Sequence, residues 1–186
     1  MIENRILVVD IETTGFLNQG GLIVEIGMVL LNLENGEVEP IYDSLICEPG
    51  FNWNHTTGGF GWIFQNSDLT PQEVFDAPSL ESQRESIQFL FDNHRATAFN
   101  KRFDFDFLRD RGFRITELPC PMVEATPIIK LPSRNGYGGY KWPKVEEAWQ
   151  YFFGNTGYIE AHRGMDDAAH EAKIVYELYK MGAFVV

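Results

Sequence analysis

The fold is decided early in the chain, by the stretch RILVVDIE at residues 5–12. Its apolar and β-branched residues are typical of a buried strand, and the strand ends in two acids. Asp10 and Glu12 are two residues apart, so their side chains share one face, about 6–7 Å apart along the strand. Two carboxylates placed in this way can converge on a pair of metal ions that lie roughly 3.5–4 Å apart. A strand that simply ends in solvent would show the same pattern.

Flexible and polar residues follow these acids directly. Gly15 allows a tight turn and lets a ligand approach the backbone. The amides and hydroxyls of Thr13 and Thr14 can contact a phosphate or a sugar. We therefore expect these three residues to bind substrate.

Strand and turn patterns predict one mixed sheet. Residues 22–33 and 38–48 indicate two antiparallel strands, joined by a turn with Asn35-Gly36 at its centre. Residues 95–99 indicate a fourth, shorter strand. Because three early strands are followed by helix–strand–helix units, we expect one domain over residues 1–186 with helices on the faces of its sheet.

Helix signals separate these strands. Thr70, Pro71 and Glu73 form the pattern of a capped helix start. Ser79 and Ser82 are alternative caps for the next helix. Further helices are predicted over residues 105–111, 145–153 and 166–181.

Composition limits the class of protein. Of 186 residues, 44% are hydrophobic and 14% aromatic, which supports a packed core rather than disorder. No apolar run reaches the roughly eighteen residues of a membrane span, and the N-terminus lacks a signal-peptide pattern. We expect a cytoplasmic protein. Cys47 and Cys120 are expected as thiols of a reducing compartment, with a single bridge as the alternative.

The chain is strongly acidic, with a net charge of −12 and a pI near 4.7. Proteins that grip long duplexes through their own surface are usually basic. The charge therefore argues against a high-affinity duplex binder, but not against a metal-dependent nuclease. The chain either binds no polynucleotide, binds a short end through metal ions and local basic patches, or depends on a partner protein to bind the nucleic acid.

The segment NKRFD at residues 100–104 follows the predicted fourth strand. Asp104 is the favoured functional acid, because Asp106 would point elsewhere around a helix that begins near Asp104. The alternative is that Asp104 only caps that helix. We expect Asn100 to bind substrate, and Phe103 either to pack as a support or to offer a face to the substrate.

A histidine and two acids stand near the end of the chain, in HRGMDD at residues 162–167. His162 lies in a predicted loop just before a helix, a setting that suits a general base near neutral pH. Asp167, near the helix N-terminus, is favoured in its ionised form, which is also the form that binds metal. Asp166 is the alternative ligand.

In their order and spacing, these three segments resemble the three sequence motifs of the DEDDh family of 3′–5′ exonucleases. This family includes the proofreading exonucleases of DNA polymerases, RNase T and oligoribonuclease. Asp10 and Glu12 match the first motif, residues 100–104 the second, and His162 with Asp167 the third, H-x4-D. Residues 22–29 also resemble the second strand of these proteins, so the likeness extends from about residue 6 to about residue 181.

The resemblance implies a ribonuclease-H-like fold: an α/β domain with a mixed five-stranded sheet and helices on both faces. It implies two Mg²⁺ or Mn²⁺ ions per site, one held by Asp10, Glu12 and Asp167 and the other by Asp10, with Asp104 assisting directly or through water. It further implies that His162 activates the attacking water and that nucleoside 5′-monophosphates are released. The chemistry agrees, because carboxylates suit such hard ions.

The expected substrates are single-stranded or frayed 3′ ends, with DNA favoured and RNA as the alternative. The proofreading members of the family make a DNA polymerase a candidate partner. The competing hypothesis is a binding module of the same fold, a polymerase or replisome accessory whose catalysis is weak or lost. The sequence leaves the oligomeric state open, together with the choice between a stand-alone enzyme and a proofreading subunit.

Two segments fit either function or packing. The aromatic residues 51–64 could stack on bases, at about 1–3 kcal/mol per base, or pack onto the core. The basic residues of 127–144 could guide a strand toward the site or form a solvated loop. The residues concerned are Trp53, Phe60 and Trp62 in the first segment and Lys130, Arg134, Lys141 and Lys144 in the second.

Overall fold

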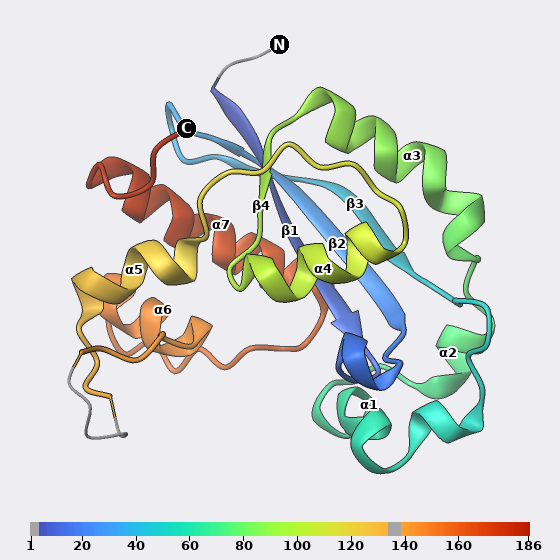
Figure 1. Ribbon diagram of the computed structural model, residues 1–186. Helices are drawn as coiled ribbons and strands as arrows, with labels where there is room; N and C mark the ends of the chain where they lie inside the picture. The colour runs from blue at the N-terminus through green and yellow to red at the C-terminus, as the bar shows by residue number, and fades with distance from the viewer. Residues whose placement is uncertain (1–3, 134–138) are drawn as a thin grey trace.

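A computed structural model describes residues 4–133 and 139–186 (Figure 1). Its centre is a mixed sheet of four strands in the order β3-β2-β1-β4. Both β1 with β2 and β2 with β3 pair antiparallel, whereas β1 with β4 pairs parallel. The strands are β1 (Arg5–Thr13), β2 (Ile23–Asn32), β3 (Val38–Leu45) and β4 (Ala96–Thr97). The mixed sheet is as predicted.

The predicted count of five strands is wrong for the described residues. Beside β4, the chain makes only an isolated parallel bridge between Ala96 and Glu117. The Ala96 N–H donates to the Thr116 carbonyl at 2.9 Å, and the Leu118 N–H donates to the Ala96 carbonyl at 2.8 Å. The next acceptor of a parallel ladder would be the Leu118 carbonyl, but this group accepts from the Lys101 ammonium at 2.7 Å instead. Pairing therefore stops after one residue.

Helices cover both faces of the sheet, as predicted (Figure 1). One face carries α3 (Leu80–Asn93) and α4 (Lys101–Asp110). The other carries α5 (Pro121–Ile129), α6 (Val145–Phe153) and α7 (Gly164–Lys180). The α5 helix was not expected and takes up the first residues of the segment 127–144. The α4 helix begins four residues before its predicted start.

Alternation along β1 sorts its side chains between the two cores. Ile6 and Val8 pack with α5, α6 and α7, while Leu7 between them packs with α3 and α4. By the same period of two, Asp10 and Glu12 fall on the α7 face. The strand thus presents both acids to the helix that carries the third motif.

Short helices fill the connections around the sheet. The Thr70 hydroxyl accepts from the Glu73 N–H and completes the predicted capping box, and Ser79 rather than Ser82 caps α3. The elements are η1 (Leu17–Gln19), η2 (Trp53–Thr56), η3 (Gly58–Gly61), α1 (Trp62–Asn66) and α2 (Pro71–Phe75).

Two expectations from composition can be compared with the structure. Cys47 and Cys120 are both free thiols, so they form no bridge. Across residues 4–133 and 139–186, no helix combines the length and the apolarity needed to cross a bilayer.

Two glycines let α7 approach the sheet closely. A Cβ at Gly27 of β2 would lie only 2.1 Å from the Gly164 carbonyl carbon and 2.2 Å from the Met165 nitrogen. Gly27 is the antiparallel partner of Asp10. This backbone contact therefore brings the first turn of α7 beside the acidic end of β1.

We expect Gly27→Ala to lower the free energy of unfolding by about 1–3 kcal/mol or more, because backbone atoms cannot move aside for the new methyl group. Gly59→Ala is the control, since its Cβ would meet nothing within 4 Å. Urea unfolding followed by circular dichroism measures both. Equal unfolding free energies for the two variants would contradict the close approach.

Candidate active site

The residues predicted to be functional meet at the carboxyl end of β1, where ligands of α/β sheets commonly bind. A hollow of about 180 Å³ opens there. Predicted residues that line it are Asp10, Glu12, Asn100, Phe103, Asp104 and His162. Asp167 adjoins the hollow: ligand atoms of Glu12, His162 and Asp167 lie within 4.8 Å of one another. Three segments that are distant in sequence therefore share one site.

Asp104 belongs to the first turn of α4 and points into the protein. It is only 4% exposed, and its Oδ1 accepts a hydrogen bond from the Ile11 N–H at 3.3 Å. Its rival Asp106 is half-buried and pairs with Arg102 and Arg109 on the same helix. Geometry thus places Asp104, rather than Asp106, beside β1.

Asp167 is held by the loop that precedes α7. Its carboxylate accepts from the Arg163 N–H at 2.9 Å, the Ala161 N–H at 3.2 Å and the Tyr158 hydroxyl at 3.3 Å. The neighbouring Asp166 is exposed and faces His170 at 3.3 Å. Of these two acids, Asp167 is the one that faces Glu12.

Asp10 has an oxygen without a partner. Although the residue keeps some exposure, its Oδ2 atom is enclosed and accepts no hydrogen bond from residues 4–133 or 139–186. A buried, unpaired carboxylate oxygen is costly. An oxygen of this kind among further carboxylates fits a hard divalent cation.

Burial and mutual repulsion disfavour the charged forms of these acids. Burial, followed by repulsion from Glu171 and Glu12, raises the pKa of Asp10 well above its ordinary value. Burial likewise raises the pKa of Glu12 and Asp167, the latter against the N–H groups that it accepts from. Burial raises the pKa of Asp104 to about 7. Bound cations would relieve this repulsion.

Two acids that sequence reasoning missed also line the hollow. Glu171 is 3% exposed, and its Oε2 accepts from the Phe99 N–H at 3.1 Å. It follows Asp167 by four residues, so the helical period could have placed it on the same face. Burial raises the pKa of Glu160 to about 8. Its irregular loop offered no comparable signal.

An arginine bracket holds the loop of the third motif. The Arg163 guanidinium donates to both carboxylate oxygens of the buried Glu25 on β2, at 3.0–3.2 Å, and to Asp68 at 2.7 Å. This network was also missed, because it joins residues 95 and 138 positions apart. It anchors the residue that directly follows His162 and precedes Asp167 in the chain.

The predicted Thr-Thr-Gly contacts are largely engaged within the protein. The Thr14 hydroxyl accepts from the Leu22 N–H at 3.0 Å, and the Thr13 hydroxyl donates to the Gly15 carbonyl at 3.0 Å. A Cβ at Gly15 would lie 3.0 Å from the Phe60 ring. These residues shape the loop beside the site. Because both hydroxyls are engaged within the protein, their backbone is the part that could contact a ligand.

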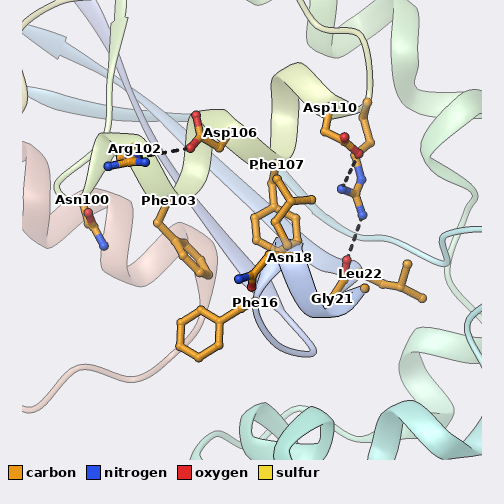
Figure 2. A pocket seen from close by; sticks show the side chains of 13 residues that line it. Phe16, Asn18, Gly21, Leu22, Asn100, Arg102, Phe103, Asp106, Phe107 and Asp110 are labelled. Atoms are coloured by element: carbon orange, nitrogen blue, oxygen red, sulfur yellow. Dashed lines mark hydrogen bonds and ion pairs between the residues drawn. The ribbon is translucent and has the colours of Figure 1, made fainter.

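A larger cleft of about 820 Å³ adjoins the hollow and shares Asn100 and Phe103 with it. Figure 2 shows Phe16, on the β1–β2 connection, facing Phe103 on α4; the ring centroids are 6.3 Å apart. Phe107 continues the same wall. An aromatic wall of this kind suits stacking with bases.

In the segments 51–64 and 127–144, which fitted either function or packing, some side chains are packed and others are exposed. Phe51 packs against Phe64 and Phe75, whereas Trp53 and Trp62 keep much of their surface exposed. In the basic segment, Lys141 pairs with Glu147 and Lys144 is exposed. Arg134 lies outside the described residues.

Known proteins similar to this chain include parts of replicative polymerases. A DNA polymerase III of the PolC type from Clostridium perfringens is 24% identical over 179 residues, which cover 96% of this chain and 11% of the polymerase. The PolC-type polymerase from Caldanaerobacter subterraneus is 24% identical over 178 residues, which cover 95% of this chain and 12% of the polymerase. The chain thus corresponds to a small part of either relative.

Solved structures with the same fold include exonucleases. The nuclease domain of 3′hExo, a DEDDh family member bound to rAMP, superposes with a TM-score of 0.70 at 16% identity, covering 98% of this chain and 96% of that one. Escherichia coli Exonuclease I in complex with a dA16 oligonucleotide gives 0.66 at 17% identity, with 95% of this chain and 41% of that one covered. Apart from the strand count, the predicted fold is confirmed. The model of the RNase T exonuclease family matches residues 7–175, so the chain belongs to this family and its resemblance to the DEDDh exonucleases is confirmed.

Proposed function

We propose that this chain is a metal-dependent 3′–5′ exonuclease that removes nucleoside 5′-monophosphates from single-stranded or frayed 3′ ends. The observation that carries the proposal is the meeting of acids from three distant segments, beside one imidazole, around an unpartnered Asp10 oxygen. An acidic hollow of this kind is costly in a protein that binds no cation.

Carboxylates of the hollow would hold two Mg²⁺ or Mn²⁺ ions. Asp10, Glu12 and Asp167 are the proposed ligands of one ion, and Asp10 with Asp104 of the other. When bound, such ions lower the pKa of a coordinated water and offset charge on a leaving oxygen.

The remaining roles fall to the chain's own side chains. His162 is the proposed general base, because its imidazole shares the site with Glu12 and Asp167. Asn100, Phe103 and the backbone of residues 13–15 would hold the terminal nucleotide. Phe16, which faces Phe103 in the larger cleft, would stack on a base.

DNA is the favoured substrate, since both curated relatives are DNA polymerases. The same likeness supports a DNA polymerase as a partner. Because 3′hExo was crystallised with rAMP, RNA stays as the second arm of a digestion assay. Release of 5′-monophosphates by the isolated chain would exclude the alternative of a binding module without catalysis.

Paired amide substitutions test the assignment of the acids. We expect Asp104→Asn and Asp167→Asn to lower the rate of nucleotide release by about a thousandfold, because several kcal/mol of charge stabilisation are lost. The matched controls Asp106→Asn and Asp166→Asn, which change neighbours that do not line the hollow, should keep near wild-type rates. Labelled single-stranded DNA and RNA with Mg²⁺, Mn²⁺ or EDTA provide the assay. A wild-type rate in either site variant would defeat the assignment.

The raised pKa of Asp104 predicts how stability depends on pH in the metal-free protein. Between its ordinary value of 3.8 and about 7, the folded chain keeps a proton that the unfolded chain has released. Stability from this group is therefore complete below about pH 4 and is lost as the pH rises to about 7.

We therefore expect the unfolding free energy of wild type, relative to Asp104→Asn, to fall between about pH 5 and about pH 7 in EDTA. Mg²⁺ should reduce the fall, because it stabilises the ionised carboxylates. Urea unfolding at each pH measures the difference. A difference that stays constant, or rises, with pH would show that Asp104 is not held in its neutral form.

A further inference from the structure

His162 lacks the support that usually orients a catalytic imidazole. Its backbone is in the left-handed region, with φ at 53°. Within residues 4–133 and 139–186, no group hydrogen-bonds to its ring. A catalytic base is commonly oriented by a further side chain that hydrogen-bonds to it. In this chain, the orientation of the His162 ring has to come from packing.

Trp62 supplies such packing. Its indole meets the His162 ring edge to face, with ring centroids 4.7 Å apart and planes at 75°. The indole is 49% exposed, so it forms the outer side of this contact. Such aromatic pairs have a preferred geometry and add stabilisation beyond the area that they bury.

The position of Trp62 is fixed by its neighbour. Ile63, the next residue of α1, is fully buried and packs with Val24 of β2, Leu69 and Val74. The Trp62 carbonyl accepts from the Asn66 side chain at 2.8 Å. The indole therefore stands on a short helix that is anchored to the sheet.

The same segment holds the loop of His162 at a second point. Asp68, just beyond α1, accepts from the Arg163 guanidinium at 2.7 Å. Residues 62–68 thus contact both the ring of His162 and the side chain that follows it. These two contacts are independent, since one is between rings and the other is an ion pair.

We propose that Trp62 is a positioning residue, which keeps the His162 imidazole turned toward the acids of the hollow. This role rests on the proposed function of His162 as general base. Under this proposal, the aromatic segment 51–64 contributes to the reaction through the indole of Trp62.

Kinetics separate this role from general packing. We expect Trp62→Leu to lower kcat about tenfold or more with little change in KM, because a displacement of about 1 Å at a catalytic group can cost on the order of a hundredfold. Trp62→Phe should recover most of the rate, since a ring again meets the imidazole. Trp53→Leu is the matched control from the same segment: its indole packs on Phe75 rather than on His162. A loss of kcat in Trp53→Leu as large as that in Trp62→Leu would overturn the proposal.

A spectroscopic measurement makes the test independent of activity. In ¹H–¹³C NMR spectra with Mg²⁺, with the His162 ring signals assigned through His162→Gln, we expect a nuclear Overhauser contact between the Trp62 and His162 rings of the wild type. The ring signals should move in Trp62→Leu and stay in place in Trp53→Leu. Absence of the contact in the wild type overturns the proposal even if Trp62→Leu does not fold.

The two proposals fail in different ways. A wild-type chain that releases no nucleotide with either metal contradicts the exonuclease function, whatever the NMR spectra show. A wild-type chain that is active, and whose kcat survives Trp62→Leu, contradicts only the role of Trp62.

Discussion

Repulsion among buried carboxylates is the constraint on which the site depends. The close contact of Gly27 with Gly164 brings α7 against β2, and Asp167 comes with it to Glu12. Parallel pairing of β1 with β4 leads the chain into α4 and sets Asp104 beside β1. Packing thus gathers acids that would separate if they were free, and burial raises the pKa of each of them. Bound cations would offset this repulsion, and the carboxylates would then serve as their ligands.

The surrounding structure compensates for only part of that cost. Backbone N–H groups donate to Asp104 and Asp167, and Arg163 neutralises Glu25 behind the site. Asp10 has an enclosed oxygen without any such donor among the described residues. The fold therefore positions the acids firmly and leaves negative charge at the centre of the hollow. Since net charge is also −12, nucleic acid would be held near this site chiefly by cations and by stacking on the aromatic cleft.

Local patterns in the sequence predicted those features that depend on residues close together in the chain. The period of two placed Asp10 and Glu12 on one face of β1, and the capping box of Thr70 marked the start of α2. The start of α4 was predicted four residues late, although Asn100 at its N-cap is a residue type favoured there. The bracket of Arg163 and the contact of Trp62 with His162 join residues 95 or more positions apart, and no local pattern encodes such pairs. The fifth strand followed from family resemblance, which cannot foresee that the Leu118 carbonyl bonds to the Lys101 side chain instead of to a strand.

Anomalous diffraction from crystals grown with Mn²⁺ tests the central claim most directly, because it locates the cations themselves. The account predicts two Mn²⁺ ions in the hollow, both contacting Asp10, one also contacting Glu12 and Asp167 and the other Asp104. Mn²⁺ at saturating concentration that binds elsewhere, or leaves the hollow without a peak while the fold is unchanged, would contradict the account.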